Sequence, residues 1–181
     1  NAAKSTGVRH VIYTSAAGSD VNHPHPLFKA KGICEDYLKE SGLGYTNLKP
    51  GVFMEIWIGS IVGIPLEANE PVTLVESGSR LQAFVSMADV VAYAVNSVDD
   101  PRALNQDILI AGPQSYSWND VVKSVSRVIK KQIPVNYISP GEPVPLVPEA
   151  VGPLLAALEM VDSYIAMNET SKTFGIEPTS L

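Results

Sequence analysis

A tyrosine and a lysine four positions apart, Tyr45 and Lys49, form the residue pair whose spacing most directly suggests catalysis. On a helix, the lysine charge would lower the pKa of the neighbouring tyrosine and prepare its hydroxyl for proton transfer. The pair lies in the segment YTNLKP, however, where strand-forming residues are followed by Pro50, which ends a strand. Residues four apart in a strand are separated by about 13 Å. We therefore reject an acid–base role for this pair.

Three other groups of residues suggest chemistry but have simpler explanations. Gly42 and Gly44 lie between a predicted helix and a strand, whereas a phosphate-binding loop leads from a strand into a helix. His23 and His25 occur in a polar loop without a third metal ligand nearby, so we expect no metal site. Cys34 is the single cysteine and cannot form an internal disulfide; we expect a core thiol.

A helix is predicted from Pro26 to about residue 41 by the spacing of its apolar residues. These recur every three or four positions and share one face, which we expect to be buried. They are Ala30, Ile33, Cys34, Tyr37 and Leu38. Gly42 follows and can adopt the left-handed conformation that ends a helix.

Two predicted strands flank this helix. His10–Thr14 is a short apolar run, typical of a strand covered on both faces, and Tyr45–Leu48 is the second. A strand, loop, helix and strand form a β-α-β unit, in which the strands are parallel. Ligands bind at the carboxyl ends of such strands. These ends are Thr14–Ser15 and Pro50–Gly51.

The rest of the chain continues the alternation of helices and strands. We expect Ser86 to cap a helix, with Asp89 completing an imperfect capping box rather than serving a pocket. Asp107–Ala111 is a further buried strand, and Ser117 begins another helix. Pro153–Met167 is the last long helix predicted.

The composition favours one well-buried domain: 45% of the 181 residues are hydrophobic. A net charge of −6 argues against a nucleic acid partner, which usually requires a basic surface. The longest apolar run, Ile56–Leu66, has about half the length of a membrane span, so we expect neither a membrane protein nor a signal peptide, and a cytoplasmic location. The first residue is Asn rather than Met, and we expect a fragment of a longer chain.

Several segments taken together resemble the NmrA-like atypical short-chain dehydrogenases/reductases. They are IYTSAAGSD, the helix that carries Lys31 and Glu35, SGLGYTNLKPGVFMEIW, FVSMADVVAYAV and the terminal FGIEPTSL. The resemblance covers nearly the whole chain. The family includes NAD(P)H:quinone oxidoreductase-like reductases, isoflavone-reductase-like enzymes and NADP-sensing regulators.

The resemblance implies a cofactor site around the first strand and the helix. Lys31 matches the family lysine that binds the nicotinamide ribose, and Thr14 and Ser15 match the strand end that passes the cofactor. Leu27 stands where many relatives have the catalytic tyrosine, and Ala16 falls at the position of the catalytic serine of extended enzymes, so no catalytic residue is assigned. The alternatives are a solvated Lys31 paired with Glu35 one turn away, and a Ser15 hydroxyl that satisfies backbone.

The resemblance also implies contacts from the second strand end. Pro50, Gly51, Val52 and Phe53 match the turn that flanks the nicotinamide. Phe53, Met54 and Trp57 would then face the substrate, although Phe53 and Trp57 are equally well explained as core residues.

We therefore expect an α/β fold: the second half of a Rossmann-type parallel sheet in residues 1–57, then a small α/β substrate region in residues 58–181. The resemblance implies an NAD(P)H-dependent reductase of a small apolar acceptor such as a quinone, with NADP favoured over NAD. The alternatives are an NADP(H)-sensing regulator that binds a protein partner without turnover, and a fragment that binds nothing by itself. A homo-oligomer is left open.

Overall fold

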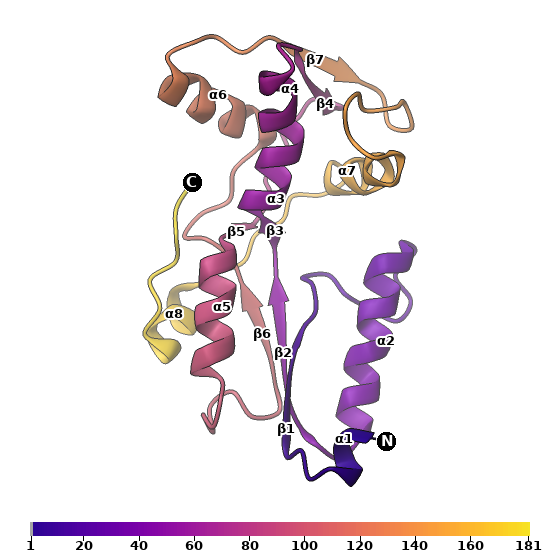
Figure 1. Ribbon diagram of the computed structural model, residues 1–181, viewed down its shortest axis with the longest axis vertical. Helices are drawn as coiled ribbons and strands as arrows, with labels where there is room; N and C mark the ends of the chain where they lie inside the picture. The colour runs from indigo at the N-terminus through magenta and orange to yellow at the C-terminus, as the bar shows by residue number, and fades with distance from the viewer. Residues whose placement is uncertain (1) are drawn as a thin grey trace.

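Figure 1 shows the computed structural model of the protein, which describes residues 2–181. Three parallel strands form its main sheet in the order β1-β2-β6: β1 (His10–Thr14), β2 (Gly44–Pro50) and β6 (Gln106–Ile110). In the sheet, His10 of β1 lies opposite Gly44 of β2, and Thr46 of β2 lies opposite Gln106 of β6. Parallel strands joined by helices confirm the predicted α/β fold.

The helices cover both faces of this sheet. They are α2 (Pro26–Glu40) on one face, and α5 (Met87–Asn96) with α8 (Asn168–Phe174) on the other (Figure 1). Because side chains alternate along a strand, Leu48 of β2 is fully buried in the core formed with α5 and α8, while Lys49 points to α2. The sheet with these three helices is called the first lobe below.

The remaining elements include a second lobe, seen above the first in Figure 1. In chain order they are α1 (Ala2–Ser5), β3 (Val52–Phe53), α3 (Met54–Ile58), the π-helical turn η1 (Gly59–Gly63), α4 (Ile64–Glu67), β4 (Val72–Val75), β5 (Phe84–Val85), α6 (Trp118–Ile129), β7 (Val135–Ile138), the 3-10 turn η2 (Glu149–Val151) and α7 (Gly152–Leu158). The second lobe consists of η1, α4, β4, α6, β7 and α7; β3 pairs with β5 and β4 with β7, both in parallel. The predicted division of the chain at residue 57 stays a prediction.

The predicted buried face of α2 is wrong. Ile33 and Tyr37 are 51% and 60% exposed, and Cys34 is exposed too, so Cys34 is not a core thiol. The buried residues of α2 are Gly32 and Glu35. A Cβ on Gly32 would lie 2.5 Å from the Asp20 carbonyl carbon, so glycine lets the helix contact the backbone of the preceding loop. This contact and the polar partners of Glu35 decide which face turns inward.

The helix starts are mostly as predicted. Ser117 and Asp120 form a capping box at the start of α6, and Ser86 caps α5 by accepting from the Ala88 amide at 3.1 Å. Asp89, in contrast, does not complete a capping box. Its carboxylate accepts from the amide and the hydroxyl of Thr179 at 2.8 and 2.7 Å, because the C-terminal segment passes beside α5.

The predicted helix Pro153–Met167 is too long, because α7 ends at Leu158. The chain beyond α7 bonds to the segment before β5: the Ser163 amide donates to the Leu81 carbonyl at 2.7 Å, and the Leu81 amide to Asp162 at 2.9 Å. These tertiary bonds use backbone groups that a longer helix would need. Within residues 2–181, no helix has the length and apolar character of a membrane span.

Replacing Gly51 by alanine should destabilise the junction between the lobes. A Cβ there would lie 2.0 Å from the Ala83 carbonyl oxygen, which also accepts from the Val52 amide at 2.9 Å. We expect the free energy of unfolding in urea to fall by about 1–3 kcal/mol or more, as for an overpacked core. The control is Gly59→Ala, where nothing lies within 4 Å of the added Cβ and the backbone is helical. Equal effects of the two substitutions would contradict the close approach at Gly51.

Candidate functional site

A cavity of about 260 Å³ opens at the carboxyl ends of β1 and β2. The backbone beyond β1 continues beside β2, with the Ser15 amide donating to Leu48 at 2.7 Å and the Ala17 amide to Pro50 at 2.8 Å. Both strand ends therefore reach the same wall. The lining residues are Thr14, Ser15, Ala16, Ala17, Leu27, Phe28, Lys31, Pro50, Gly51, Val52, Phe53, Trp57, Leu154, Leu158 and Ser163.

The structure brings all but one of the residues expected at the cofactor or the substrate into this one cavity. The lining includes every residue expected at the cofactor, together with Trp57, which was expected at the substrate. Met54 is not among the lining residues; its side chain packs against the core of the second lobe, as that of Trp57 does in addition to lining the cavity. Their roles in binding stay predictions.

Sequence reasoning missed Ala17, Phe28 and the three lining residues that follow η2. Phe28 lies three positions before Lys31 on the same helix, so a helical projection from Lys31 would have found it. Leu154, Leu158 and Ser163 come from a distant part of the chain, and nothing in the local sequence indicates that this segment returns to the strand ends. The Nε2 atom of buried Gln82 donates to the Leu158 carbonyl at 2.7 Å and helps to hold α7 there.

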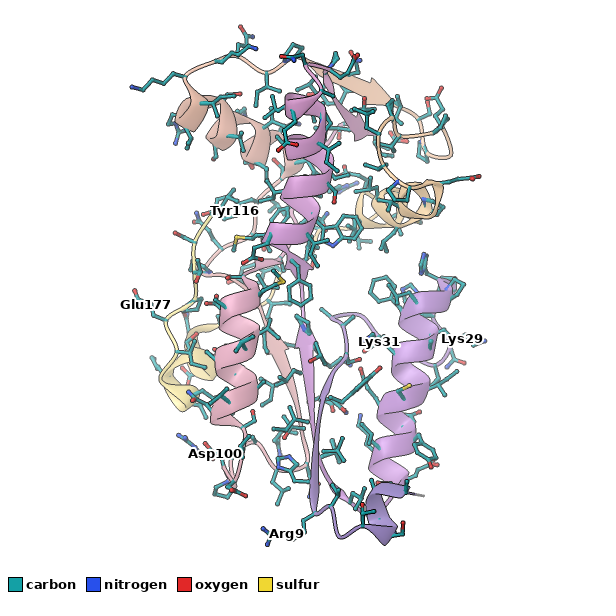
Figure 2. All side chains as sticks on the ribbon, viewed as in Figure 1. Arg9, Lys29, Lys31, Asp100, Tyr116 and Glu177 are labelled. Carbon is teal, nitrogen blue, oxygen red and sulfur yellow. The ribbon has the colours of Figure 1, made fainter. Side chains whose placement is uncertain are left out.

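Lys31 faces the sheet from α2, whereas Lys29 points away from it (Figure 2). The Nζ atom of Lys31 donates to the Thr14 carbonyl at 2.7 Å and lies 5.0 Å from the centre of the Tyr13 ring. Within residues 2–181, no carboxylate pairs with Lys31, and it is the only charged side chain that lines the cavity. An ammonium group has three hydrogens, so two remain for a ligand.

The expected alternative partner of Lys31 is engaged elsewhere. Glu35 pairs with Lys49 of β2, with 2.9 Å between Nζ and Oε2. Lys49 is the lysine of the rejected tyrosine–lysine pair, and its place in β2 confirms that this pair lies in a strand. The local alternative for Lys31, an ion pair with Glu35 one turn away, is therefore wrong.

The cavity wall offers few groups that could donate a proton. Leu27 and Ala16 carry no acidic hydrogen, and the Ser15 hydroxyl donates to Glu35. Burial, followed by the hydrogen bond to Cys34 and the charge of Glu35, raises the pKa of Tyr13 to about 12, so this tyrosine stays neutral beneath Lys31. The rest of the wall is largely aliphatic and aromatic. Such a wall suits a largely apolar ligand with a polar group near Lys31.

The two histidines of the loop help to build the start of α2. His25 is its N-cap and accepts from the Leu27 amide at 3.3 Å, while His23 accepts from the His25 amide at 3.0 Å. Both rings also contact Phe28: the ring centres of His23 and His25 lie 4.8 and 5.7 Å from that of Phe28. No cluster of three residues able to hold a metal occurs in the described part of the chain.

The sheet, the flanking helices and a cavity at the strand ends define a Rossmann-type α/β protein. The chain belongs to the NmrA-like family, whose pattern it matches over residues 1–181.

The relatives are named reductases. The chain is 26% identical to the probable pinoresinol-lariciresinol reductase 3 of Arabidopsis thaliana, over 83% of the chain and 49% of that protein. It is also 26% identical to an isoflavone reductase homologue of Nicotiana glauca, over 98% of the chain and 60% of the relative. The NAD(P)H azoreductase of Xenophilus azovorans shows the same identity, over 76% of the chain and 46% of that protein. The chain thus spans about half the length of these relatives.

Solved structures show the same fold. An NADPH-dependent quinone oxidoreductase from Escherichia coli, in complex with NADPH, matches with a TM-score of 0.79 at 21% identity, over 99% of this chain and 65% of that one. An isoflavone reductase matches with a TM-score of 0.69 at 19% identity, over 98% and 64%.

Glu159, the C-cap residue of α7, lies in the segment that covers the cavity, and its buried carboxyl should make the stability of the protein depend on pH. Burial raises the pKa of its carboxyl, and the Arg80 amide and charge offset this only in part. A carboxyl whose pKa is higher in the folded than in the unfolded protein contributes stability at pH values below its unfolded pKa. This contribution is lost as the pH rises through the folded pKa. We therefore expect Glu159→Gln to increase the free energy of unfolding at pH 7.5 and to change it little at pH 4.

The matched control is Glu70→Gln, because Glu70 is exposed just after α4. Urea unfolding at both pH values gives the comparison. A loss of stability in Glu159→Gln at pH 7.5, or the same gain in both variants, would contradict the cost assigned to the buried carboxylate.

Proposed function

We propose that this protein is an NAD(P)H-dependent reductase that transfers hydride to a small apolar acceptor such as a quinone, with NADPH as the preferred donor. The observation that carries the proposal is the position of Lys31: one cation at the parallel strand ends, facing a cavity whose wall is otherwise uncharged and largely apolar. Cofactors of Rossmann-type proteins bind at this edge of the sheet.

The cavity fits the reactive end of the cofactor and an acceptor ring rather than a whole dinucleotide. Its volume of about 260 Å³ lies just under the range of about 300–1,000 Å³ for complete small-molecule sites. Lys31 would donate to ribose hydroxyls from one side, and the Pro50–Phe53 turn would lie against the nicotinamide. The bound cofactor supplies the hydride.

The chain's own residues would orient the reactants and exclude water. Phe53, Trp57, Leu154 and Leu158 form an apolar wall, which keeps a flat acceptor close to the cofactor. Gly51 presents bare backbone at this wall, because the Ala83 carbonyl leaves no room for a side chain. Reductase names among the relatives support the reaction class, and their different acceptors leave the particular substrate to experiment.

A second candidate is an NADP(H)-sensing protein that binds the cofactor without turnover. It is favoured by the lack of an acidic side chain at Leu27 and Ala16, the two positions where a proton donor was expected. A reductase of acceptors that take protons from solvent does not need such a side chain, and for this reason we prefer the first candidate.

We expect the full-length protein to oxidise NADPH, followed by the loss of its absorbance, when quinones of increasing size are added. Small, flat quinones should react faster than bulky ones, because the wall formed by Trp57, Leu154 and Leu158 limits the space. NADPH binding without oxidation across the whole panel would favour the sensing protein instead.

Lys31→Ala should weaken NADPH binding by about tenfold or more, since it removes charge-assisted hydrogen bonds. Lys29→Ala is the matched control: Lys29 lies on the same helix, exposed, and points away from the sheet (Figure 2), so its removal should leave the affinity unchanged. Titration calorimetry measures both. Equal affinities of wild type and Lys31→Ala would rule out the cofactor contact.

A further inference from the structure

Glu35 is a buried carboxylate one helical turn beyond Lys31. It is 3% exposed and joins three parts of the first lobe. Its Oε1 accepts from the hydroxyls of Ser15, just after β1, and of Ser19 in the following loop, and its Oε2 pairs with Lys49 of β2 at 2.9 Å. The side chain of Lys49 is 14% exposed, so both charges lie largely away from water.

A charged pair in this position needs an explanation, because burying ions costs free energy that apolar residues would not. The groups around Glu35 form part of the cavity wall: Ser15 lines the cavity, and the carbonyl of adjacent Thr14 accepts from Lys31. Holding Ser15 therefore also holds the carbonyl that orients the Lys31 ammonium.

The pairing with Lys49 also determines what Lys31 can do. Positions 31 and 35 are one turn apart, the spacing at which lysine and glutamate normally pair on a helix. In this structure the ammonium of Lys49 takes the carboxylate, and Lys31 bonds to the Thr14 carbonyl instead. Lys49 thus balances the charge of Glu35, and the ammonium group of Lys31 stays at the cavity.

We propose that Glu35 is a positioning residue of the candidate site: it fixes the Thr14–Ser15 wall, and its pairing with Lys49 keeps Lys31 directed at the cavity. The proposal rests on the proposed function, in which Lys31 binds the cofactor. It assigns no contact between Glu35 and any ligand.

Lys49→Met in the full-length protein tests the charge assignment. Without Lys49 the carboxylate of Glu35 should attract Lys31, and NADPH affinity should fall by about tenfold. Adding Glu35→Gln to this variant removes the competing charge and retains an oxygen that can accept from Ser15 and Ser19. The double variant should bind NADPH within about threefold of wild type, since no competing charge remains.

If Glu35 and Lys49 only stabilise the fold, the double variant should bind NADPH no better than Lys49→Met, because removing both partners would damage the fold at least as much as removing one. Affinity in the double variant as low as in Lys49→Met would overturn the proposal, and so would unchanged affinity in Lys49→Met. If Lys49→Met does not fold, two double variants decide. Glu35→Gln with Lys49→Met keeps an acceptor for Ser15 and Ser19 and should bind NADPH within about threefold of wild type, whereas Glu35→Leu with Lys49→Met lacks this acceptor and should bind about tenfold more weakly. Equal affinities of the two double variants would overturn the proposal.

A crystal structure of Lys49→Met without cofactor separates this proposal from the proposed function. We expect Lys31 Nζ to leave the Thr14 carbonyl and to lie within ion-pair distance of Glu35. An unchanged Lys31 contact would overturn the positioning role even if NADPH binds as proposed. A moved Lys31 in a protein that never binds NADPH would support the positioning role and leave the proposed function contradicted. For a Lys49→Met that does not fold, the crystal comparison uses the two double variants. Lys31 should keep its bond to Thr14 in Glu35→Gln with Lys49→Met, and the Thr14–Ser15 segment should move in Glu35→Leu with Lys49→Met; an unmoved segment would overturn the positioning role.

Discussion

The parallel pairing of β1 with β2 is the constraint on which the candidate site depends. Parallel strands end at the same edge of a sheet, and here the pairing continues past β1 through the amides of Ser15 and Ala17. The Thr14–Ala17 segment is thereby held beside Pro50 and Gly51. Backbone bonds thus bring the wall residues of the two strands together, and the side chain of Glu35 holds Ser15 in addition.

The helix that completes the wall shows how far sequence reasoning extends. Its start and length follow from apolar spacing and from Gly42, and the observed helix Pro26–Glu40 confirms them. Its orientation does not follow from that pattern, because the pattern counts apolar residues, whereas this helix buries a glycine and a glutamate. Gly32 contacts backbone, and Glu35 has partners that lie 14 or more positions away in the sequence. Only the folded chain brings these partners together.

The same distinction separates the predicted lining residues from the missed ones. Thr14, Ser15, Pro50 and Gly51 could be predicted, since a strand end is a local feature and its position in a parallel sheet is known in advance. Leu154 and Leu158 could not, because their approach depends on bonds between residues 81–82 and 158–163. Local pattern predicts elements and strand ends well, and long-range backbone bonds determine what else meets them.

The second lobe reaches the cavity through one continuous helical run, α3, η1 and α4. Pro65 has no amide hydrogen and cannot donate to the carbonyl four residues earlier, and the chain widens into the π-helical turn Gly59–Gly63 just before it. Wide turns of this kind accommodate such a missing bond and bend the helix. Trp57 at the cavity and Ile61 in the second core therefore belong to one continuous helical run. Because Trp57 lines the cavity and also packs against the core of the second lobe, the shape of the cavity depends on the packing of that lobe.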